Sequence, residues 1–293
     1  MTTIRDLGPA ELSSLIYQAS ALRDEIDRGA RVERSLVGRS VANLFFEPST
    51  RTRLSFDLAA QRLGADVVTF SPETSSTSKG ESLRDTVLTV AAMGVDFMVV
   101  RHAEDGVPQR VADWTGVPVI NAGDGMSEHP TQALLDAVTI QRHFGKLAGL
   151  RLGLVGDIAH SRVAGSLIHA LPVLGVDVTL IGPGEWVPAN TGLATSDGLD
   201  PLLGDLDIVY LLRVQTERGG VVSEDYVSRF QMDRRRSSRL NENAIVMHPG
   251  PLNRGVEVED SVADSPRSRI IEQVRNGVPT RMAVLRALGA GAE

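Results

Sequence analysis

Short apolar runs alternate with helical patterns along this chain, and no other feature constrains its fold as much. Runs of strand character at 41–46, 66–70, 95–101 and 117–121 are joined through helical patterns that include 81–93 and 103–115. A β-α alternation with short connections predicts a mostly parallel sheet covered by helices. The alternation starts again at Leu150, after a glycine-containing boundary at 145–149. We therefore expect an α/β fold with two doubly wound parallel-sheet domains.

The second half of the chain repeats the alternation and ends in a helical tail. Strands are predicted at 177–181, 207–212 and 244–248, and further helices at 9–29 and 131–144. The tail at 266–288 predicts one helical segment interrupted by Gly277 and Pro279. The arginine-rich run at 233–239 is typical of a solvated helix face. A length of 293 residues fits two domains of ordinary size.

Composition excludes several classes of function. The chain has no cysteine, which excludes disulfides, thiolate metal ligands and cysteine nucleophiles. Its formal charge of −7 argues against nucleic acid or an anionic membrane as the main partner. No run approaches about 18 consecutive apolar residues, and the amino terminus lacks a signal-peptide pattern. We expect a cytoplasmic enzyme with no metal and no cofactor.

The stretch at 45–56 joins the end of a strand to the start of a helix. The apolar run stops before Pro48, and a helical pattern then continues to Gly64. Four side chains suited to an anion fall in the first turn of this helix: Ser49, Thr50, Arg51 and Thr52. Unpaired backbone N–H groups and the helix dipole favour a phosphate dianion at that end, and an arginine can hold two of its oxygens. The alternative is a capped surface helix with exposed arginines.

Two further places carry residues of the same character. Arg101 closes a predicted strand, where α/β proteins bind ligands, although structural ion pairs also occur there. His129 and Gln132 lie at the start of a helix, with Pro130 suited to its first position. A loop histidine alone is more often a packing or capping residue, so these residues by themselves leave the question open.

The motifs together resemble one family. The sequence F-x-E-P-S-T-R-T-R-x-S-F at 45–56 is similar to the carbamoyl phosphate signature of the aspartate/ornithine carbamoyltransferases, and H-P-T-Q-x-L-x-D at 129–136 is similar to another motif of that family. The resemblance runs from about Arg5 to Leu288, with the motifs in the family's order. It implies that carbamoyl phosphate is bound by the following residues: Ser49, Thr50, Arg51, Thr52, Arg101, His129 and Gln132, with the main chain of Gly250 and Pro251.

A polar loop precedes the helix predicted at 81–93. It contains Ser75, Ser76 and Lys79, and from the residues alone it is either a solvated loop or a mobile lid with one cation. The resemblance implies that this loop enters the active site of a neighbouring subunit, that Lys79 acts there in catalysis and aspartate binding, and that the enzyme is a homotrimer. Regulatory or dihydroorotase subunits are further partners that the resemblance leaves open.

The second half of the chain supplies candidates for the acceptor substrate. The family resemblance assigns Arg162 to the amino acid, and Arg213 and Gln215 follow another predicted strand. Two arginines suit a ligand with two carboxylates, which favours aspartate over ornithine. The sequence H-P-G-P at 248–251 also resembles the aspartate branch, because the H-C-L-P pattern of the ornithine branch needs a cysteine. The glycine turn at 153–157 lacks G-x-G-x-x-G, which argues against a dinucleotide site.

The resemblance also predicts the domain organisation and the reaction. Residues 1–133 would form a carbamoyl phosphate-binding domain, residues 134–267 an aspartate-binding domain, and a helix at about 268–290 would pack back on the first, with interdomain helices joining the two. The implied reaction transfers the carbamoyl group to L-aspartate, the second step of pyrimidine biosynthesis. Three alternatives remain: transfer to ornithine or another amine, a catalytically inactive homologue, and a nucleotide-binding protein.

Overall fold

The computed structural model describes residues 1–70, 80–215 and 222–290. Its residues form two compact units, one of Met1–Val138 with Val274–Glu293 and one of Thr139–Gln273. The chain crosses from one unit to the other within α5 (Pro130–Phe144) and again within α10 (Ile270–Ala290). Both connections are therefore helices. None of the helices in the described residues is long and apolar enough to cross a membrane.

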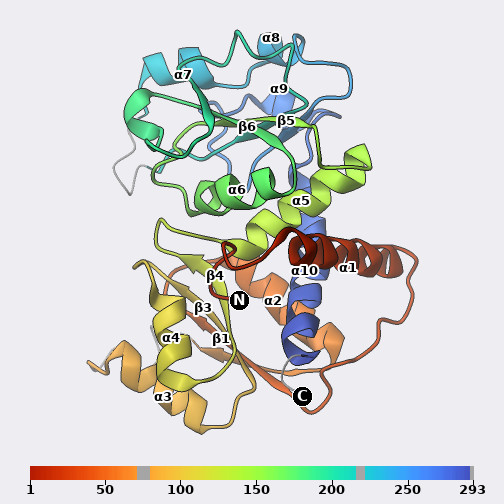
Figure 1. Cartoon of the computed structure of the whole chain (residues 1–293), viewed down its shortest axis with the longest axis vertical. Helices are drawn as coiled ribbons and strands as arrows, with labels where there is room; N and C mark the ends of the chain where they lie inside the picture. The colour runs from red at the N-terminus through yellow and green to blue at the C-terminus, as the bar shows by residue number, and fades with distance from the viewer. Residues whose placement is uncertain (71–79, 216–221, 291–293) are drawn as a thin grey trace. The chain divides into compact units, whose positions relative to one another are not determined.

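The first unit is built on a parallel sheet with strand order β2-β1-β3-β4. Its strands are β1 (Ser40–Phe45), β2 (Asp66–Phe70), β3 (Phe97–His102) and β4 (Val119–Asp124), and its helices besides α5 and α10 are α1 (Pro9–Asp27), α2 (Thr50–Leu63), α3 (Leu83–Ala92) and α4 (Val107–Thr115). Apolar side chains of α3 and α4, including Val87 and Val111, pack with Leu44 and Met98 of the central strands. α2 and the carboxyl-terminal part of α10 cover the opposite face (Figure 1).

The second unit has a parallel sheet with strand order β7-β6-β5-β8-β9. Its strands are β5 (Arg151–Val155), β6 (Asp177–Ile181), β7 (Ala194–Ser196), β8 (Ile208–Leu211) and β9 (Ile245–Met247), and its helical segments are α6 (Arg162–Val173), η3 (Gly184–Trp186), α7 (Glu224–Phe230), α8 (Arg234–Ser237) and α9 (Asp260–Ala263). α6 lies on one face of the sheet (Figure 1). Tyr226 of α7 and Val262 of α9 belong to the apolar core on the other face. The predicted α/β class with two parallel sheets is confirmed.

Two local predictions were wrong. α10 is continuous through Gly277 and Pro279, where an interruption was predicted. Residues 282–285 of this helix are buried, and the Thr280 hydroxyl donates to the carbonyl of Asn276 at 2.7 Å within the turn that contains the proline. Packing of the buried face therefore outweighs the loss of one backbone hydrogen bond.

The arginine-rich run at 233–239 is not simply a solvated face. Arg234 and Arg235 of α8 are exposed, but Arg236 is buried with 3% of its surface exposed. Its guanidinium donates to Asp200 at 2.6 Å and to the carbonyl oxygens of Gln231 and Ser228. Arg236 thus ties together segments of the second unit that are distant in sequence.

Candidate functional site

The carboxyl ends of β1 and β3 form the centre of the candidate site in the first unit. The chain leaves β1 toward β2 on one side and later returns to β3 on the other, so this pair is the point where the direction of winding reverses. Ligands of open α/β sheets bind at such a point. Phe45 is paired with Arg101 in the register of these strands, and the backbone N–H of Phe46 donates to the carbonyl of Arg101 at 2.9 Å.

The helix that follows β1 begins as the sequence predicts. Ser49 is the N-cap with extended backbone, and α2 runs from Thr50 until Gly64, whose φ of 88° ends it. Within the described structure, the Ser49 side chain makes no capping hydrogen bond and the first turn contains no acidic residue. The first N–H groups of the helix therefore keep their capacity to bind an anion.

Arg51 and Thr52 face different surroundings on this turn. Arg51 is exposed, and its pKa is lowered from the usual value by partial desolvation of the guanidinium. Thr52 is buried, with 7% of its surface exposed. A flexible cation and a fixed hydroxyl thus lie side by side in the sequence at the start of one helix.

Arg101 lies at the end of β3 and is held from both neighbouring segments. Its Nε lies 3.1 Å from Oε2 of Glu47, in the connection after β1, and its Nη1 donates to the carbonyl of Ala122 in β4 at 3.4 Å. The guanidinium is thus fixed at the edge of the sheet by groups on either side. The ion pair expected as one alternative for Arg101 is present, and its role toward a ligand stays a prediction.

His129 and Gln132 are brought to the same edge by the loop after β4. His129 is 4% exposed, and its carbonyl accepts a hydrogen bond from the Gln132 N–H at 2.9 Å. The Gln132 side chain donates to Oδ1 of Asp136, which is fully buried, at 3.0 Å. Pro130 is the first residue of α5, as predicted. A neutral amide and an imidazole are therefore held near the start of one helix.

Arg281 was not predicted and belongs to the same neighbourhood. It comes from α10, donates from Nη1 to Oγ of Ser55 in α2 at 2.8 Å, and lies over the Phe56 ring with its Cζ 5.0 Å from the centroid. Desolvation, reinforced by the charge of Arg101 and partly opposed by the Asp136 carboxylate, lowers the pKa of Arg281 to about 9. The only sequence signal was a single charged residue within the apolar run 278–285.

The predicted residues of the second unit also gather at one edge of its sheet. Val155 of β5 is paired with Leu211 of β8, and Tyr210 with Met247 of β9, so the segments after these three strands leave the same edge. β5 and β8 are again the point where the winding reverses. These segments carry the following predicted residues: Arg162, Arg213, Gln215, Gly250 and Pro251.

Buried carboxylates fix the backbone at this edge. Asp157 is fully buried, accepts from the Gln215 N–H at 3.0 Å and pairs with Nδ1 of His160 at 2.6 Å. Glu257 is 1% exposed and accepts from the Val214 N–H at 2.9 Å. Burial raises the pKa of Glu257, and the hydrogen bonds to its carboxylate oppose that shift. Neither acid was predicted from the sequence.

The remaining predicted residues lie at the helix start and in the last loop. Arg162 is the first residue of α6 and is 8% exposed, with Ser161 as the N-cap of that helix. The Gly250–Pro251 peptide bond is cis. Gly250 has a φ of 66°, and its N–H donates to Nδ1 of His248 at 2.8 Å. Lys79, Ser75 and Ser76 lie outside the described residues.

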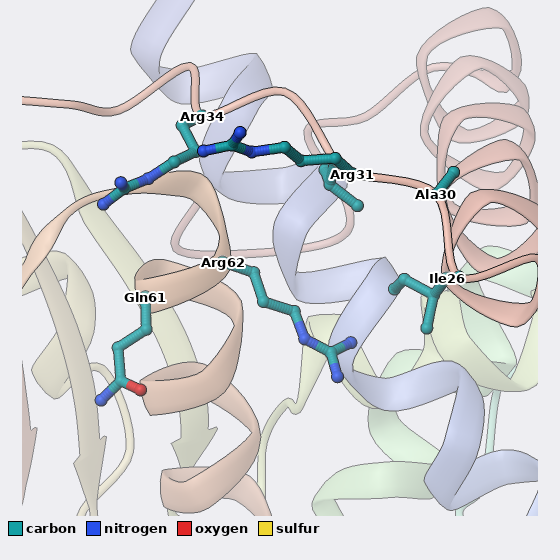
Figure 2. Close-up of a pocket in the computed structure, with 8 residues that line it drawn as sticks. Ile26, Ala30, Arg31, Arg34, Gln61 and Arg62 are labelled. Atoms are coloured by element: carbon teal, nitrogen blue, oxygen red, sulfur yellow. The ribbon is translucent and has the colours of Figure 1, made fainter.

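A cavity of about 350 Å³ occurs elsewhere in the first unit. Figure 2 shows Arg31 and Arg34 on the connection after α1, with Gln61 and Arg62 on the last turns of α2. A rise of about 1.5 Å per residue places Arg62 roughly 15 Å along the helix from Thr52. The cavity is therefore at the opposite end of α2 from the predicted phosphate site, and none of the predicted site residues that the structure describes lines it.

Comparison with known proteins assigns the family. Residues 1–142 match the model of the "aspartate/ornithine carbamoyltransferase, carbamoyl-P binding domain", and residues 148–288 match that of the "Asp/Orn binding domain". The chain belongs to the aspartate/ornithine carbamoyltransferase family. The boundary between the two family domains, at 142–148, lies close to the first crossing between the units, whereas residues 274–288 match the second family domain and belong to the first unit.

Individual relatives are similar over nearly their whole length. The aspartate carbamoyltransferase catalytic subunit of Salinispora arenicola is 49% identical over 98% of this chain and 96% of its own, and that of Acidothermus cellulolyticus is 50% identical over 98% and 91%. The Trypanosoma cruzi aspartate transcarbamoylase solved with carbamoyl aspartate and phosphate has a TM-score of 0.91 at 33% identity, covering 98% of this chain and 94% of that one. Its complex with carbamoyl phosphate and aspartate gives 0.88 at 32% identity, over 98% and 95%.

Proposed function

We propose that this enzyme transfers the carbamoyl group of carbamoyl phosphate to the amine of L-aspartate, giving N-carbamoyl-L-aspartate and phosphate. The observation that carries the proposal is the start of α2, where an N-terminus without an acidic residue bears Arg51 and Thr52 at the reversal point of the sheet. Relatives at 49–50% identity that are named aspartate carbamoyltransferase support the same acceptor. The product would enter pyrimidine biosynthesis.

The phosphate of the donor binds at the start of α2. The hydroxyls of Ser49, Thr50 and Thr52 and the N–H groups of the first turn take its oxygens, and Arg51 neutralises the leaving dianion. Lys79 adds a second positive charge in the active site of a neighbouring subunit. Phosphate departure is then easier because its charge is met by groups that are already in place.

The carbonyl of the donor is polarised by Thr52, Arg101 and His129. These groups donate to the oxygen on which negative charge develops as the amine attacks and the carbon becomes tetrahedral. Gln132 and the main-chain carbonyls of Gly250 and Pro251 hold the carbamoyl NH2 group. No covalent enzyme intermediate is needed, because orientation of the two substrates provides a large part of the acceleration.

Aspartate binds to residues of the second unit. Arg162 and Arg213 each pair with one carboxylate, and Gln215 adds a neutral donor. The phosphate oxygens of the donor accept the proton that the amine loses. Two arginines favour a dicarboxylate over ornithine, whose side chain ends in an ammonium group.

Aspartate-dependent release of phosphate from carbamoyl phosphate tests this proposal. We expect turnover with aspartate, no turnover with ornithine at equal concentration, and inhibition by N-(phosphonacetyl)-L-aspartate, which joins the two substrates in one molecule. Turnover with ornithine alone would contradict the choice of acceptor. No turnover with either amino acid would contradict the proposed activity and support the alternative of a catalytically inactive homologue.

A homotrimer is part of the same proposal. Leu54 and Leu58 of α2 are 51% and 46% exposed, so the phosphate helix presents apolar side chains outward. Such side chains on a helix that begins in the site suit contact with a second copy of the chain. Mixing the inactive variants Lys79→Ala and Arg101→Ala tests whether sites are shared between subunits. Where the two variants are neighbours in one oligomer, a shared site would combine Arg101 of the first variant with Lys79 of the second and would be active. No recovered activity in verified mixed oligomers would place Lys79 in the site of its own subunit.

A further inference from the structure

The amino-terminal segment Thr2–Arg5 binds the loop that leads to His129. The contact is made by Glu128, whose side chain is buried with 3% of the residue's surface exposed. Its carboxylate accepts from the Thr3 hydroxyl at 2.6 Å and from the Ile4 N–H at 2.7 Å, and it pairs with Nε of Arg5 at 3.1 Å. Three consecutive residues thus contribute donors to one carboxylate.

Backbone hydrogen bonds align this segment with β4 before it reaches Glu128. The N–H of Asn121 donates to the carbonyl of Met1 at 3.0 Å, and its side-chain amide donates to the carbonyl of Thr2 at 2.9 Å. The segment therefore arrives at Glu128 in a fixed position. A buried carboxylate is costly unless it is hydrogen-bonded, so Glu128 and its three donors constrain each other.

The loop between β4 and His129 is short and is held both by its own backbone and by the segment after β3. The N–H of Asp124 donates to the carbonyl of Glu128 at 2.9 Å, and Oδ1 of Asp105 accepts from the N–H of Met126 at 2.8 Å. The N–H of Gly125 also donates to the carbonyl of His102 at 3.0 Å, so the first part of the loop is tied to the end of β3 and to the segment after it. The Glu128 side chain supplies the contact at the last residue of the loop, next to His129.

His129 follows Glu128 directly in the chain and is hydrogen-bonded to the first turn of α5. Its carbonyl accepts from the N–H groups of Gln132 at 2.9 Å and Ala133 at 3.3 Å, in the first turn of that helix. A displacement of Glu128 would therefore move the imidazole of His129 and the amide of Gln132 together. Both side chains belong to the site assigned to the carbamoyl group of the donor, His129 at its carbonyl oxygen and Gln132 at its NH2 group.

We propose that Glu128, held by Thr3, Ile4 and Arg5, is a positioning residue that places His129 against the carbonyl oxygen of carbamoyl phosphate. The inference rests on the proposed function. Glu128 touches neither substrate in this role and acts only through its neighbour in the chain. The phosphate site at the start of α2 has its own supports and does not depend on it.

The predicted effect separates kcat from donor binding. Displacement of a catalytic group by about 1 Å can cost roughly a hundredfold in rate. We expect Glu128→Met, which keeps the length of the side chain but removes its acceptors, to lower kcat at least ~10-fold. The KM for carbamoyl phosphate should change less than ~3-fold because its phosphate is bound by α2. Glu128→Gln keeps one acceptor oxygen, which can take the Ile4 N–H, while its NH2 group can donate to the Thr3 hydroxyl, so it should retain more of kcat than Glu128→Met.

Two adjacent threonines give a matched pair of variants. The Thr3 hydroxyl donates to Glu128 at 2.6 Å, whereas the Thr2 hydroxyl donates to Oε1 of Gln109 on α4, also at 2.6 Å. Thr3→Val and Thr2→Val each remove a hydroxyl donor whose hydrogen bond has the same length, and Thr3→Val also removes the acceptor of the Arg5 N–H at 3.1 Å. We expect Thr3→Val to lower kcat ~3-fold or more and to speed hydrogen exchange at the Gln132 and Ala133 amides, and Thr2→Val to do neither.

The comparison is made in full-length enzyme at a temperature well below the unfolding transition of every variant. Glu128→Met and Thr3→Val enzymes with kcat within twofold of the unmodified enzyme would overturn the proposal. Equal losses in Thr2→Val and Thr3→Val would also overturn it, because they would indicate a general effect of the segment. An unmodified enzyme without aspartate-dependent phosphate release would instead overturn the proposed function. The exchange comparison needs no turnover and would still show whether Glu128 holds the His129 loop.

Discussion

Arg281 donates from Nη1 to the hydroxyl of Ser55 at 2.8 Å, joining α10 to the phosphate helix α2 although 226 positions separate the two residues. Gly277, one turn earlier in α10, leaves the space for this contact. A Cβ at Gly277 would lie 2.8 Å from Nη1 of Arg281 and 3.3 Å from Oγ of Ser55. The guanidinium is buried, so it cannot move away without losing a partner.

Gly277→Ala is therefore expected to destabilise the protein. Helix propensity alone predicts the opposite, a gain of about 1 kcal/mol for alanine inside a helix. The clash with a buried side chain predicts a loss of about 1–3 kcal/mol. Chemical denaturation of both proteins decides the sign. A more stable Gly277→Ala protein would show that the Arg281–Ser55 contact adapts freely.

Arg51→Ala is expected to abolish turnover without unfolding the protein. Arg51 is exposed at the start of α2, and removal of an exposed side chain usually changes stability by about 0.5 kcal/mol or less. We expect phosphate release to fall at least ~100-fold, since the charge that meets the leaving group is lost.

The control for Arg51 is Arg110→Ala. Arg110 pairs with Glu104 at the surface at 3.0 Å and is not part of the candidate site. Both variants should unfold within a few degrees of the unmodified enzyme, and only Arg51→Ala should lose activity. Near-normal turnover in Arg51→Ala would remove the phosphate assignment of this residue.

His102 links the end of β3 to the pH dependence of stability. Desolvation lowers its pKa below the usual value, and its Nδ1 accepts from the Glu104 N–H at 2.9 Å. The unfolded chain therefore takes up a proton at a higher pH than the folded protein. Stability from neutral His102 is fully present above about pH 6.5 and is lost as the pH falls from there through the lower folded-state pKa.

His102→Asn tests this sign. Asparagine can accept from the Glu104 N–H but does not titrate in this range. Urea midpoints at pH 5.5 and pH 8 should differ less in the variant than in the unmodified protein. An unchanged difference would assign the acid sensitivity to other groups.

The start and end of α2 could be predicted from sequence because their signals are local. A proline and a hydroxyl residue mark the beginning of this helix, and Gly64 with positive φ marks its end. Arg101 near the end of a strand and His129 just before a helix were predicted for the same reason. Motif and topology together were sufficient for these residues.

Residues that act over long sequence distances could not be predicted. The partners of Arg281, Glu128 and Glu257 are side chains on distant segments or backbone N–H groups. The periodicity of apolar residues in a sequence does not predict such contacts. Arg236 shows the limit most clearly, because it shares a run of like residues with exposed arginines. Only the folded chain shows which member of the run turns inward.

Glu257→Ala is expected to impair aspartate use more than donor binding. Glu257 accepts from the Val214 N–H and from the backbone and side chain of Asn253. Val214 lies between Arg213 and Gln215, so loss of the carboxylate releases the segment that carries both. We expect the KM for aspartate to rise ~10-fold or more, with little change for carbamoyl phosphate. Glu257→Gln retains one acceptor oxygen, so its KM for aspartate should lie between those of the unmodified enzyme and Glu257→Ala. Equal changes in the KM for aspartate and for carbamoyl phosphate would contradict this role.

Arg236 and Arg235 contact the same aspartate but differ in burial, which makes them a matched pair for stability. Arg236 has 4% of its side chain exposed and donates to Asp200 and two backbone carbonyls, whereas Arg235 has 71% exposed and lies 3.6 Å from Asp200. Arg236→Met should cost about 2–4 kcal/mol because it removes a buried guanidinium that donates to Asp200 and to two partly buried carbonyl oxygens. Arg235→Met should cost less than about 1 kcal/mol, as exposed ion pairs do. Equal losses in urea denaturation would mean that the charge near Asp200, and not the buried hydrogen bonds, stabilises this part of the second unit.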